Sequence, residues 1–482
     1  MSGAKELTIL QINDSHAYLE PHPEVFWTAA GSEYRMGGGY ARLAALVRGI
    51  RAETKGACLL ADCGDTFHGT YPAVQSQGLA LLPVLNAIGP VAMTVHWEFA
   101  YTPQGVQKIA AGLNYPILAI NVYDKKTGNL VFPPYLVKEV GSLRVGLVGI
   151  ASNIVDKTMP PHFSQGLRFS DGRQELPSYL NLLREKEKVD LVILVSHLGF
   201  PQEVELLRQV AGVDVCLSGH THNRLYQPVV VGQTLVIQSG LHGSFLGRLD
   251  LTVEGKRVTS YRHRLIAITP DLHPDDEVEG MISTILEPSR EFLGQVVGET
   301  DSPLDRGGML ETTMDNLLLQ SIIDLTGAEV AFSNGWRYAA PVPSGPVTMN
   351  DLYNIIPENP PVSTVNLTGY EIREMLEENL ERTFSRDPFG QMGGYIKRML
   401  GVTVLVKIEN PAGQRVQQLF LGEKEIDLHR LYRAAFVTEQ GVPAKFGQGR
   451  QDLPERAVDA LKRYLEKHSP VRAELRGTVR AV

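Results

Sequence analysis

Short groups of aspartate and histidine follow four apolar segments in the first half of this 482-residue chain. They are Asn13–His16, Asp62–Asp65, Ser196–His197 and Ser218–Asn223. In open α/β sheets, functional groups gather at the carboxyl ends of strands, so side chains distant in sequence can meet there. Carboxylates and imidazoles are ligands for Mn²⁺, Zn²⁺ or Fe²⁺. The pattern predicts two cations that share Asp65 and hold a hydroxide between them as the nucleophile.

Each single group also has a structural explanation. An aspartate can cap a turn, and a buried histidine can be held by hydrogen bonds; alone, Ser196–His197 is better explained in that way. Four such groups at successive strand ends are better explained by metal binding. The strongest part of the pattern is Asp14-x-His16 together with His220-x-His222.

The elements that must position these groups alternate between apolar runs and amphipathic stretches. Continuous apolar runs predict buried strands at 7–12, 58–61, 91–95, 117–122, 145–150, 191–195 and 213–217. Helical spacing predicts helices at 40–52, 79–87, 103–113, 175–187 and 202–211. Period-2 patterning over 234–268, with a turn at Glu254–Gly255, predicts antiparallel strands. Such alternation predicts stacked sheets covered by helices.

The composition of the sequence changes after residue 268. A polar, proline-punctuated stretch and one helix indicate an interdomain connection, so we predict domains at 1–268 and 297–482 with a linker helix at 269–296. In the second domain we expect helices at 315–325 and 369–383, with the acidic stretch 371–381 as a solvated helix face.

Composition excludes several classes of protein. The 46 Lys+Arg and 54 Asp+Glu give a net charge of −8, which excludes a basic nucleic-acid coat. A hydrophobic fraction of 43% predicts sizeable cores and excludes disorder as the dominant state. No run approaches the roughly 18 apolar residues of a membrane span, and no signal-peptide core is present. We therefore expect a cytoplasmic protein without membrane or nucleic-acid partners, or a periplasmic one if a leader was removed. The three cysteines are expected to be reduced.

The metal-binding motifs resemble those of a known family. Asn13-Asp-x-His16, Gly38-Gly-x-x-Arg42, Gly64-Asp65, Ser196-His197 and Gly219-His-Thr-His222 are similar to the motifs of calcineurin-like metallophosphoesterases. Their order and spacing resemble those of the two-domain 5′-nucleotidases.

The second half of the chain extends this resemblance. Thr313-Met-Asp-Asn-Leu317, Ser333-Asn-Gly-Trp-Arg337, Val347-Thr-Met-Asn-Asp351 and Leu367-Thr-Gly369 resemble the substrate-binding domain of that family. The resemblance implies a four-layer α/β/β/α metallophosphoesterase domain followed by an α/β substrate domain of the 5′-nucleotidase type.

The family resemblance implies a dinuclear metal site and a small-molecule substrate. One ion would have the ligands Asp14, His16, Asp65 and His222, and the other Asp65, His197 and His220, with His96 at the position of a family asparagine ligand. Mn²⁺ is the favoured ion, with Zn²⁺ or Fe²⁺ as alternatives. The implied reaction is hydrolysis of a nucleotide or another phosphate ester.

The sequence departs from the family at the catalytic pair. The family motif Asn-His-Glu-Phe-Asp is here His96-Trp-Glu-Phe-Ala100, so Trp97 and Ala100 stand where a histidine and an aspartate transfer protons. The indole N–H of Trp97 could position an oxyanion, or the ring could be a packing wall of the pocket. The family's glycine-rich, base-holding stretch is also not evident around 440–447.

A second branch shares these departures. His96–Phe99, Trp336-Arg337 and Asp387–Gly394 resemble the SoxB-type thiosulfohydrolases, which release sulfate from a cysteine-linked sulfur-carrier protein. Loss of a general acid costs about 10²–10⁴-fold, which favours a good leaving group such as a thiolate. The alternatives are therefore a phosphoesterase, a SoxB-like thiosulfohydrolase, and a metal-binding protein with little catalysis.

Several residues of the second domain are candidates for substrate binding. Arg337 could clamp an anion bidentately, or form a surface ion pair. Arg398 and Lys397 are weaker candidates for the same role, and Tyr395 or Phe446 could stack on a base or fill a core. In the first domain, His68 and His242 are not expected to be ligands, and Gly37–Gly39 is expected to be a turn.

Overall fold

The computed structural model describes residues 4–482, which form two compact units. Unit 1 contains the chain up to Glu24 and Arg35–Pro288. Unit 2 contains Val25–Tyr34 and Ser289–Val482. Among the described residues, no helix is long and apolar enough to cross a lipid bilayer.

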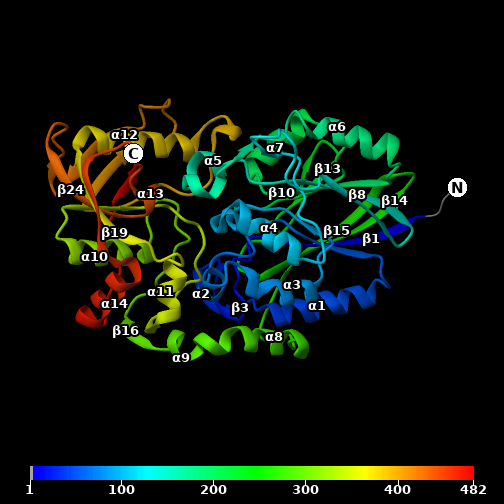
Figure 1. Ribbon diagram of the computed structural model, residues 1–482, viewed down its shortest axis with the longest axis horizontal. Coiled ribbons are helices and arrows are strands. Elements are labelled where there is room, and N and C mark those ends of the chain that lie inside the picture. The colour runs from blue at the N-terminus through cyan, green and yellow to red at the C-terminus, as the bar shows by residue number, and fades with distance from the viewer. Residues whose placement is uncertain (1–3) are drawn as a thin grey trace. The chain divides into compact units, whose positions relative to one another are not determined.

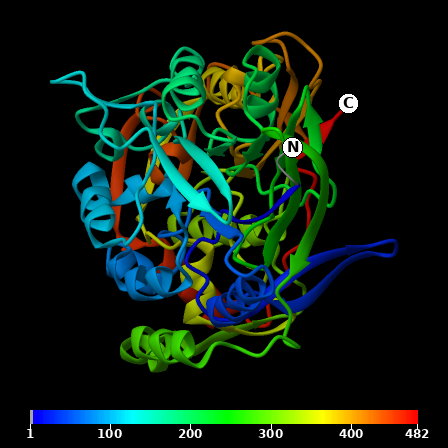
Figure 2. The same ribbon diagram turned by 90° about the vertical axis from the view of Figure 1, so that its right-hand side faces the viewer.

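Two segments are arranged in a way that the sequence does not suggest. The stretch 269–296 is divided, because α8 (Asp276–Leu286) belongs to unit 1 and α9 (Arg290–Leu293) to unit 2. A hairpin of β2 (His22–Thr28) and β3 (Gly31–Gly37), the long dark blue ribbon in Figure 2, has no counterpart among the predicted elements. Its tip belongs to unit 2.

The first sheet of unit 1 has the strand order β15-β14-β1-β4-β5. Strands β1, β4 and β5 are parallel, and β14 and β15 extend the sheet as an antiparallel pair. The bounds are β1 Lys5–Ile12, β4 Cys58–Asp62, β5 Ala92–Met93, β14 Phe245–Glu254 and β15 Arg257–Ala267. The predicted antiparallel strands are thus confirmed for 245–267, with Gly255 and Lys256 between them, whereas 234–237 forms β13 of the second sheet.

The second sheet of unit 1 has the order β12-β13-β11-β10-β8-β7. Its four middle strands are parallel. The bounds are β7 Tyr135–Val140, β8 Leu143–Ile150, β10 Leu191–Ser196, β11 Val215–Leu217, β12 Val229–Val231 and β13 Thr234–Ile237. Further elements of unit 1 are α2 Tyr71–Gln75, α3 Leu82–Ile88, α4 Thr102–Gly112, α5 Val155–Thr158, α6 Leu176–Asn181, β6 Val122–Asp124 and β9 Leu167–Phe169.

The apolar faces of the two sheets pack against each other. The buried cluster between them includes Ile9 from the first sheet and Ile193 and Leu217 from the second. Helix α1 (Tyr40–Glu53) packs against β4, and α7 (Phe200–Gln209) against β12. Figure 1 shows α6 and α7 above the strands of unit 1 and α1 and α3 below them. Unit 1 is therefore the four-layer α/β/β/α sandwich.

The predicted strand at 117–122 is wrong, since only its last residue lies in a strand. Leu118 N donates to Met93 O of the first sheet at 2.7 Å, and Ile120 N donates to Gly149 O of the second at 2.9 Å. The segment thus bonds to both sheets and cannot pair continuously with either.

Unit 2 is a second α/β domain with a five-stranded sheet of order β20-β17-β24-β19-β25. The bounds are β17 Val330–Ser333, β19 Pro361–Thr368, β20 Arg398–Leu400, β24 Leu431–Val437 and β25 Gln448–Arg456. Smaller sheets contain β16 Val296–Thr300 with β18 Gly345–Thr348, and β21 Val402–Val406 with β22 Val416–Leu421, β23 Lys424–Glu425 and β26 Val479–Ala481.

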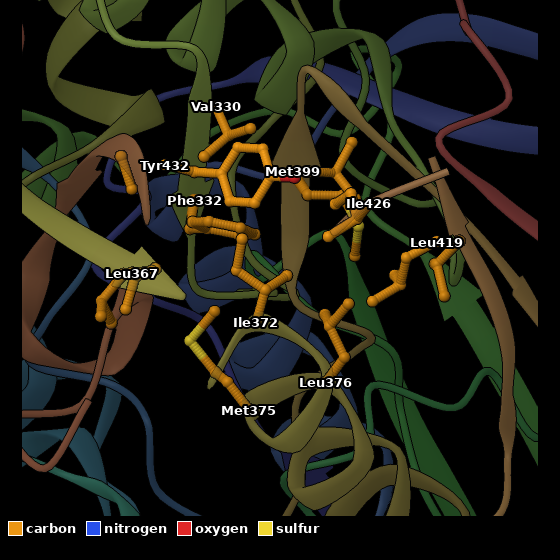
Figure 3. Packing of buried hydrophobic residues seen from close by; sticks show 14 of the residues in the cluster. Val330, Phe332, Leu367, Ile372, Met375, Leu376, Met399, Leu419, Ile426 and Tyr432 are labelled. Atoms are coloured by element: carbon orange, nitrogen blue, oxygen red, sulfur yellow. The ribbon is translucent and has the colours of Figure 1, made fainter. Parts of the chain in front are cut away.

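In the part of the chain that the structure describes, unit 2 contains five α-helices besides α9, and three of them begin at a threonine cap. The five are α10 Thr313–Thr326, α11 Met349–Ile355, α12 Gly369–Phe384, α13 Thr438–Gly441 and α14 Ala457–His468. Thr348 and Thr368 form capping boxes at α11 and α12, which fixes where these helices start. Figure 3 shows Ile372 and Leu376 of α12 pointing into a core that also contains Phe332.

Candidate metal centre

Aspartate and histidine side chains from the ends of five strands form two adjacent groups in unit 1. Each group contains ligand atoms that lie within 4.8 Å of one another, and Asp65 belongs to both. The residues are Asp14, His16, Asp65 and His222 in the first group, and Asp65, His96, His197 and His220 in the second. The fold thus brings together every residue that the sequence suggested as a metal ligand.

Asp65 lies between the imidazoles of both groups. Its Oδ2 is 3.2 Å from His197 Nε2 and 3.8 Å from His16 Nε2. Its Oδ1 is 3.1 Å from His96 Nδ1. One carboxylate can therefore contact ions at both positions, since its Oδ2 lies near imidazoles of both groups.

Hydrogen bonds between loops fix these positions. Asp14 N donates to Gly64 O at 2.9 Å, and His16 N donates to Asp65 O at 2.8 Å. The backbone N–H of His220 donates to Asp14 Oδ2 at 2.9 Å. The loops after β1, β4 and β11 consequently hold one another, although they are up to about 200 residues apart in sequence.

The backbone of the site is strained. Left-handed φ angles are uncommon outside glycine and cluster at functional sites. Five of the seven residues adopt them: Asp14 (50°), His16 (49°), Asp65 (57°), His220 (72°) and His222 (59°). The five left-handed residues mark these loops as functional, and this evidence does not depend on the types of side chain present.

The imidazoles present nitrogen lone pairs toward the two groups. His16 Nδ1 donates to His68 O at 3.0 Å, and His197 Nδ1 donates to the Cys63 carbonyl, so Nε2 is the unprotonated atom in each neutral ring. Among residues 4–482, the buried atoms His96 Nε2 and His197 Nε2 have no hydrogen-bond partner of good geometry. Buried polar atoms normally have partners, so these residues fit a divalent cation.

The electrostatics also favour cations. Burial alone would raise the pKa of Asp65, but His96 and His197 hold it well below its usual value. Burial lowers the pKa of His16 to about 3. Burial would lower the pKa of His197 as well, yet Asp65 and Asp14 raise it to about 10. The carboxylates are therefore ionised at neutral pH. Their negative charge favours a proton on the His197 ring, and a bound cation would compete with that proton for the ring nitrogen.

Two glycines provide the space for His197. A Cβ atom at Gly64 would lie 3.2 Å from His197 Nδ1 and 2.8 Å from Thr94 O. A Cβ atom at Gly219 would lie 2.8 Å from the same nitrogen. Gly64 thus permits the close approach expected from its place before Asp65.

Glu98 supports the site and was missed in the sequence. Its Oε1 accepts from Thr66 N at 2.8 Å and its Oε2 from His96 N at 2.8 Å, and the side chain is fully buried. It joins the loop of Asp65 to the loop of His96. The sequence signal that could have identified it is its place between Trp97 and Phe99. A charged residue in an apolar stretch tends to be buried, and a buried charge needs hydrogen-bond partners.

Trp97 supports the site through its backbone. Its N–H donates to Asp65 Oδ1 at 2.8 Å. Its ring stacks on His68, with centroids 4.8 Å apart and planes inclined by 19°, and also contacts Phe163. The stacking shows a packing function for the indole, and a role for it toward substrate stays a prediction.

The substrate-binding candidates of unit 2 lie near one another. The Arg337 guanidinium is 6.0 Å from the centroid of the Tyr395 ring, and the Arg398 guanidinium is 5.3 Å from it. Arg337 and Tyr395 are half-buried. Arg398 is buried and donates to the carbonyls of Met309 and Gly308, so much of its hydrogen-bonding capacity is used within the protein.

A buried ion-pair cluster next to this group was missed. Asp315 Oδ2 is 3.0 Å from Arg398 Nε, and Asp315 Oδ1 is 2.9 Å from Arg306 Nη2. Lys397 is also buried and donates to Gln440 O at 2.6 Å. In this part of unit 2 two guanidiniums therefore surround one carboxylate, and Lys397 binds backbone carbonyls instead. Phe446, the other aromatic candidate, is buried and belongs to the apolar core.

Two protein families match separate parts of the chain. Residues 7–224 match the calcineurin-like phosphoesterase family. Residues 296–438 match the C-terminal domain of 5′-nucleotidases.

Curated proteins of similar sequence are hydrolases of nucleotides. The chain is 25% identical to the trifunctional nucleotide phosphoesterase YfkN of Bacillus subtilis over 86% of its length, but it spans only 30% of that protein. It is 23% identical to the 5′-nucleotidase of Vibrio cholerae, covering 97% of this chain and 91% of that protein.

Solved structures show the same fold. The sulfate thiohydrolase SoxB of Thermus thermophilus superposes with a TM-score of 0.92 at 24% identity, covering 99% of this chain and 96% of the other. A 5′-nucleotidase precursor, also from Thermus thermophilus, gives a TM-score of 0.87 at 24% identity, covering 99% of both chains. One fold thus accommodates both named activities.

Proposed function

This chain is a calcineurin-like phosphoesterase with a 5′-nucleotidase C-terminal domain, and from that premise we propose that it is a dinuclear metal-dependent hydrolase of nucleotides or related phosphate esters. The observation that carries the proposal is the pair of groups sharing Asp65. Asp14, His16, Asp65 and His222 would hold one ion. Asp65, His96, His197 and His220 would hold the other.

The donor set suits Mn²⁺, and Zn²⁺ or Fe²⁺ fit the same ligands. When bound, two such ions supply a nucleophile from water near neutral pH and neutralise charge on a tetrahedral oxyanion. The protein's own contribution is to fix the ligands. Asp65 is held by the Trp97 N–H, and its loop by Glu98.

Arg337 is the proposed contact for the substrate anion in unit 2. Its planar guanidinium can bind a phosphate bidentately. It is half-buried beside Tyr395, whose ring offers a flat face to a base. Arg398 is a less suitable contact, because Asp315 and two backbone carbonyls already bind it.

A SoxB-like thiosulfohydrolase is the second candidate, because of residues at the site itself. Trp97 and Ala100 offer no side chain that transfers a proton, which favours substrates whose leaving group needs no protonation. A thiolate on a cysteine-linked carrier protein meets that condition. The SoxB structure supports this candidate through its fold alone.

Product analysis separates the candidates. We expect the Mn²⁺-loaded protein to release phosphate from nucleoside 5′-monophosphates, and His220→Ala to abolish the release. Sulfate release from a cysteine S-thiosulfonate peptide, without phosphate release, would favour the second candidate. No turnover of either substrate with both ions bound would indicate a metal-binding protein with little catalysis.

A further inference from the structure

A buried network centred on Glu24 adjoins the metal centre in unit 1. Glu24 Oε1 is 2.9 Å from Arg224 Nη2. Glu24 Oε2 accepts from Ser244 Oγ at 2.8 Å and lies 3.2 Å from His242 Nδ1. His22 Nε2 is 3.1 Å from the same Ser244 hydroxyl. All five side chains are less than 10% exposed, so the network is part of the interior.

The glycine run Gly37–Gly39 borders this network, and Gly38 provides space for it. A Cβ atom at Gly38 would lie only 2.6 Å from His22 Cε1, and one at Gly37 would lie 3.6 Å from Glu24 Cβ. The run lacks the lysine and spacing of a phosphate loop. Gly38 instead admits the imidazole of His22, and a Cβ atom at Gly39 would lie 3.0 Å from Pro21 Cδ.

Two loops of the metal centre are tied to Glu24. Arg224 follows the candidate ligand His222 by two residues, so its ion pair with Glu24 anchors that loop. His242 donates its backbone N–H to Asp14 O at 2.8 Å, and its ring contacts His16 edge-on with centroids 6.3 Å apart. Like the ligand residues, His242 has a left-handed φ, of 58°.

Two imidazoles and a carboxylate, from His22, His242 and Glu24, also lie close enough together to hold a cation. The hydrogen bonds argue against it. Burial alone would raise the pKa of Glu24, but His242 and Arg224 lower it to about 2, so the carboxylate is ionised. One of its oxygens already faces a guanidinium, and the other accepts from a hydroxyl. A cation would have to displace these donors beside a positive charge.

We propose that Glu24 is a positioning residue for one half of the metal centre. Through Arg224 and His242 it holds the loops that carry the first group, Asp14, His16 and His222. In the second group, His220 shares the loop of His222 and Arg224, whereas His96 and His197 lie on other loops, after β5 and β10. Loss of Glu24 should therefore weaken the ion of the first group more than the ion of the second. This inference rests on the proposed binding of two ions.

Metal titration of the full chain tests the inference. Chelator-stripped wild type, Glu24→Gln and Glu53→Gln are titrated with Mn²⁺ by calorimetry, and the bound ions are examined by electron paramagnetic resonance. Glu53 is the matched control, since it also pairs with an arginine, Arg248 at 2.8 Å, but away from the site. Second-layer partners of metal ligands contribute about 10–100-fold to affinity.

We expect Glu24→Gln to bind the ion of the first group about 10–100-fold more weakly than the wild type, with a smaller effect on the ion of the second group. Its spectrum should change from that of a coupled pair to that of an isolated Mn²⁺. Glu53→Gln should behave as the wild type. If Glu24→Gln does not fold, Ser244→Ala removes one hydrogen bond to the same oxygen and should shift the same ion in the same direction.

Three results would overturn the inference: equal weakening of both ions, unchanged binding in Glu24→Gln, or a third wild-type ion that is lost in this variant. The last result would make the network itself a cation site. A wild type that binds two ions but hydrolyses no phosphate ester would instead overturn the proposed function and leave the positioning role standing.

Discussion

The backbone N–H of Trp97 donates a 2.8 Å hydrogen bond to Oδ1 of Asp65. The indole is not needed for that bond, so position 97 can be changed without releasing the carboxylate that both groups share. Support of the metal ligand and chemistry toward the substrate can therefore be tested separately at one residue.

Restoring a proton-transferring pair should increase phosphoesterase turnover. A positioned general acid contributes about 10²–10⁴-fold, so Trp97→His combined with Ala100→Asp should raise kcat for a nucleoside 5′-monophosphate by at least about tenfold. The single variant Ala100→Asp is the control, because it adds a carboxylate without the imidazole. An unchanged kcat with two ions bound would show that proton transfer does not limit turnover.

The shared carboxylate should be needed for binding of both ions, whereas a histidine of one group should be needed for binding of one ion only. Asp65→Asn removes a negative charge between the groups, whereas His222→Ala removes a ligand from the first group only. Elemental analysis after gel filtration should find loss of both ions from Asp65→Asn and of about one ion from His222→Ala. Equal metal content in the two variants would contradict the shared role of Asp65.

Asp315 should be essential for the stability of unit 2. Arg306 and Arg398 lie 2.9 and 3.0 Å from its oxygens, and all three side chains are buried. Asp315→Asn leaves two buried guanidiniums with no carboxylate, which should lower the free energy of unfolding by about 3–5 kcal/mol. Urea unfolding followed by circular dichroism measures this change.

Asp324→Asn is the control for that measurement, because Asp324 lies on the same helix, α10, and pairs with the exposed Lys467 at 3.1 Å. Exposed pairs contribute at most about 1 kcal/mol. Equal destabilisation by the two substitutions would show that burial of Asp315 is not what matters.

Lys397 should make the stability of unit 2 dependent on pH. Burial lowers the pKa of its ammonium from 10.5 to about 7. Between these values the unfolded chain binds a proton that the folded chain does not, so stability rises with pH. Relative to Lys397→Met, the wild type should gain up to about 1.4 kcal/mol per pH unit in this window, with no change below pH 7.

Urea unfolding at pH values from 6 to 10 tests this dependence. Lys397→Gln keeps a donor for the carbonyls of Gln440 and Gly441, and it should give the same pH-dependent difference as Lys397→Met. Parallel stability curves for wild type and both variants would show that Lys397 does not titrate in this range.

The sequence was informative where local pattern and final environment agree. Continuous apolar runs such as 191–195 predict buried parallel strands, and β10 covers this run. The helix expected at 369–383 is also present, because Thr368 caps it and its apolar residues repeat at helical spacing. Its acidic face is only partly solvated, however. Glu377 is buried and accepts backbone N–H groups of Arg415 and Val416.

Supporting residues were beyond the reach of sequence because their partners are distant. Glu24 meets Arg224 and Ser244 about 200 positions away, and nothing near Glu24 in the chain indicates either partner. The hairpin that carries Glu24 has no clean alternation of apolar and polar residues, so it escaped the strand pattern. The strand predicted at 117–122 failed for a related reason, since hydrogen bonds to two sheets outweighed local propensity.

By itself, the sequence determined the types of side chain at the metal centre and their places at strand ends, because those follow from apolar runs and the residues directly after them. Only the tertiary structure decided which oxygen of Asp65 faces which imidazole, and which buried carboxylates hold the loops. These relations depend on the packing of two sheets. The alternation of side chains along a strand contains no information about the sheet that will lie against it.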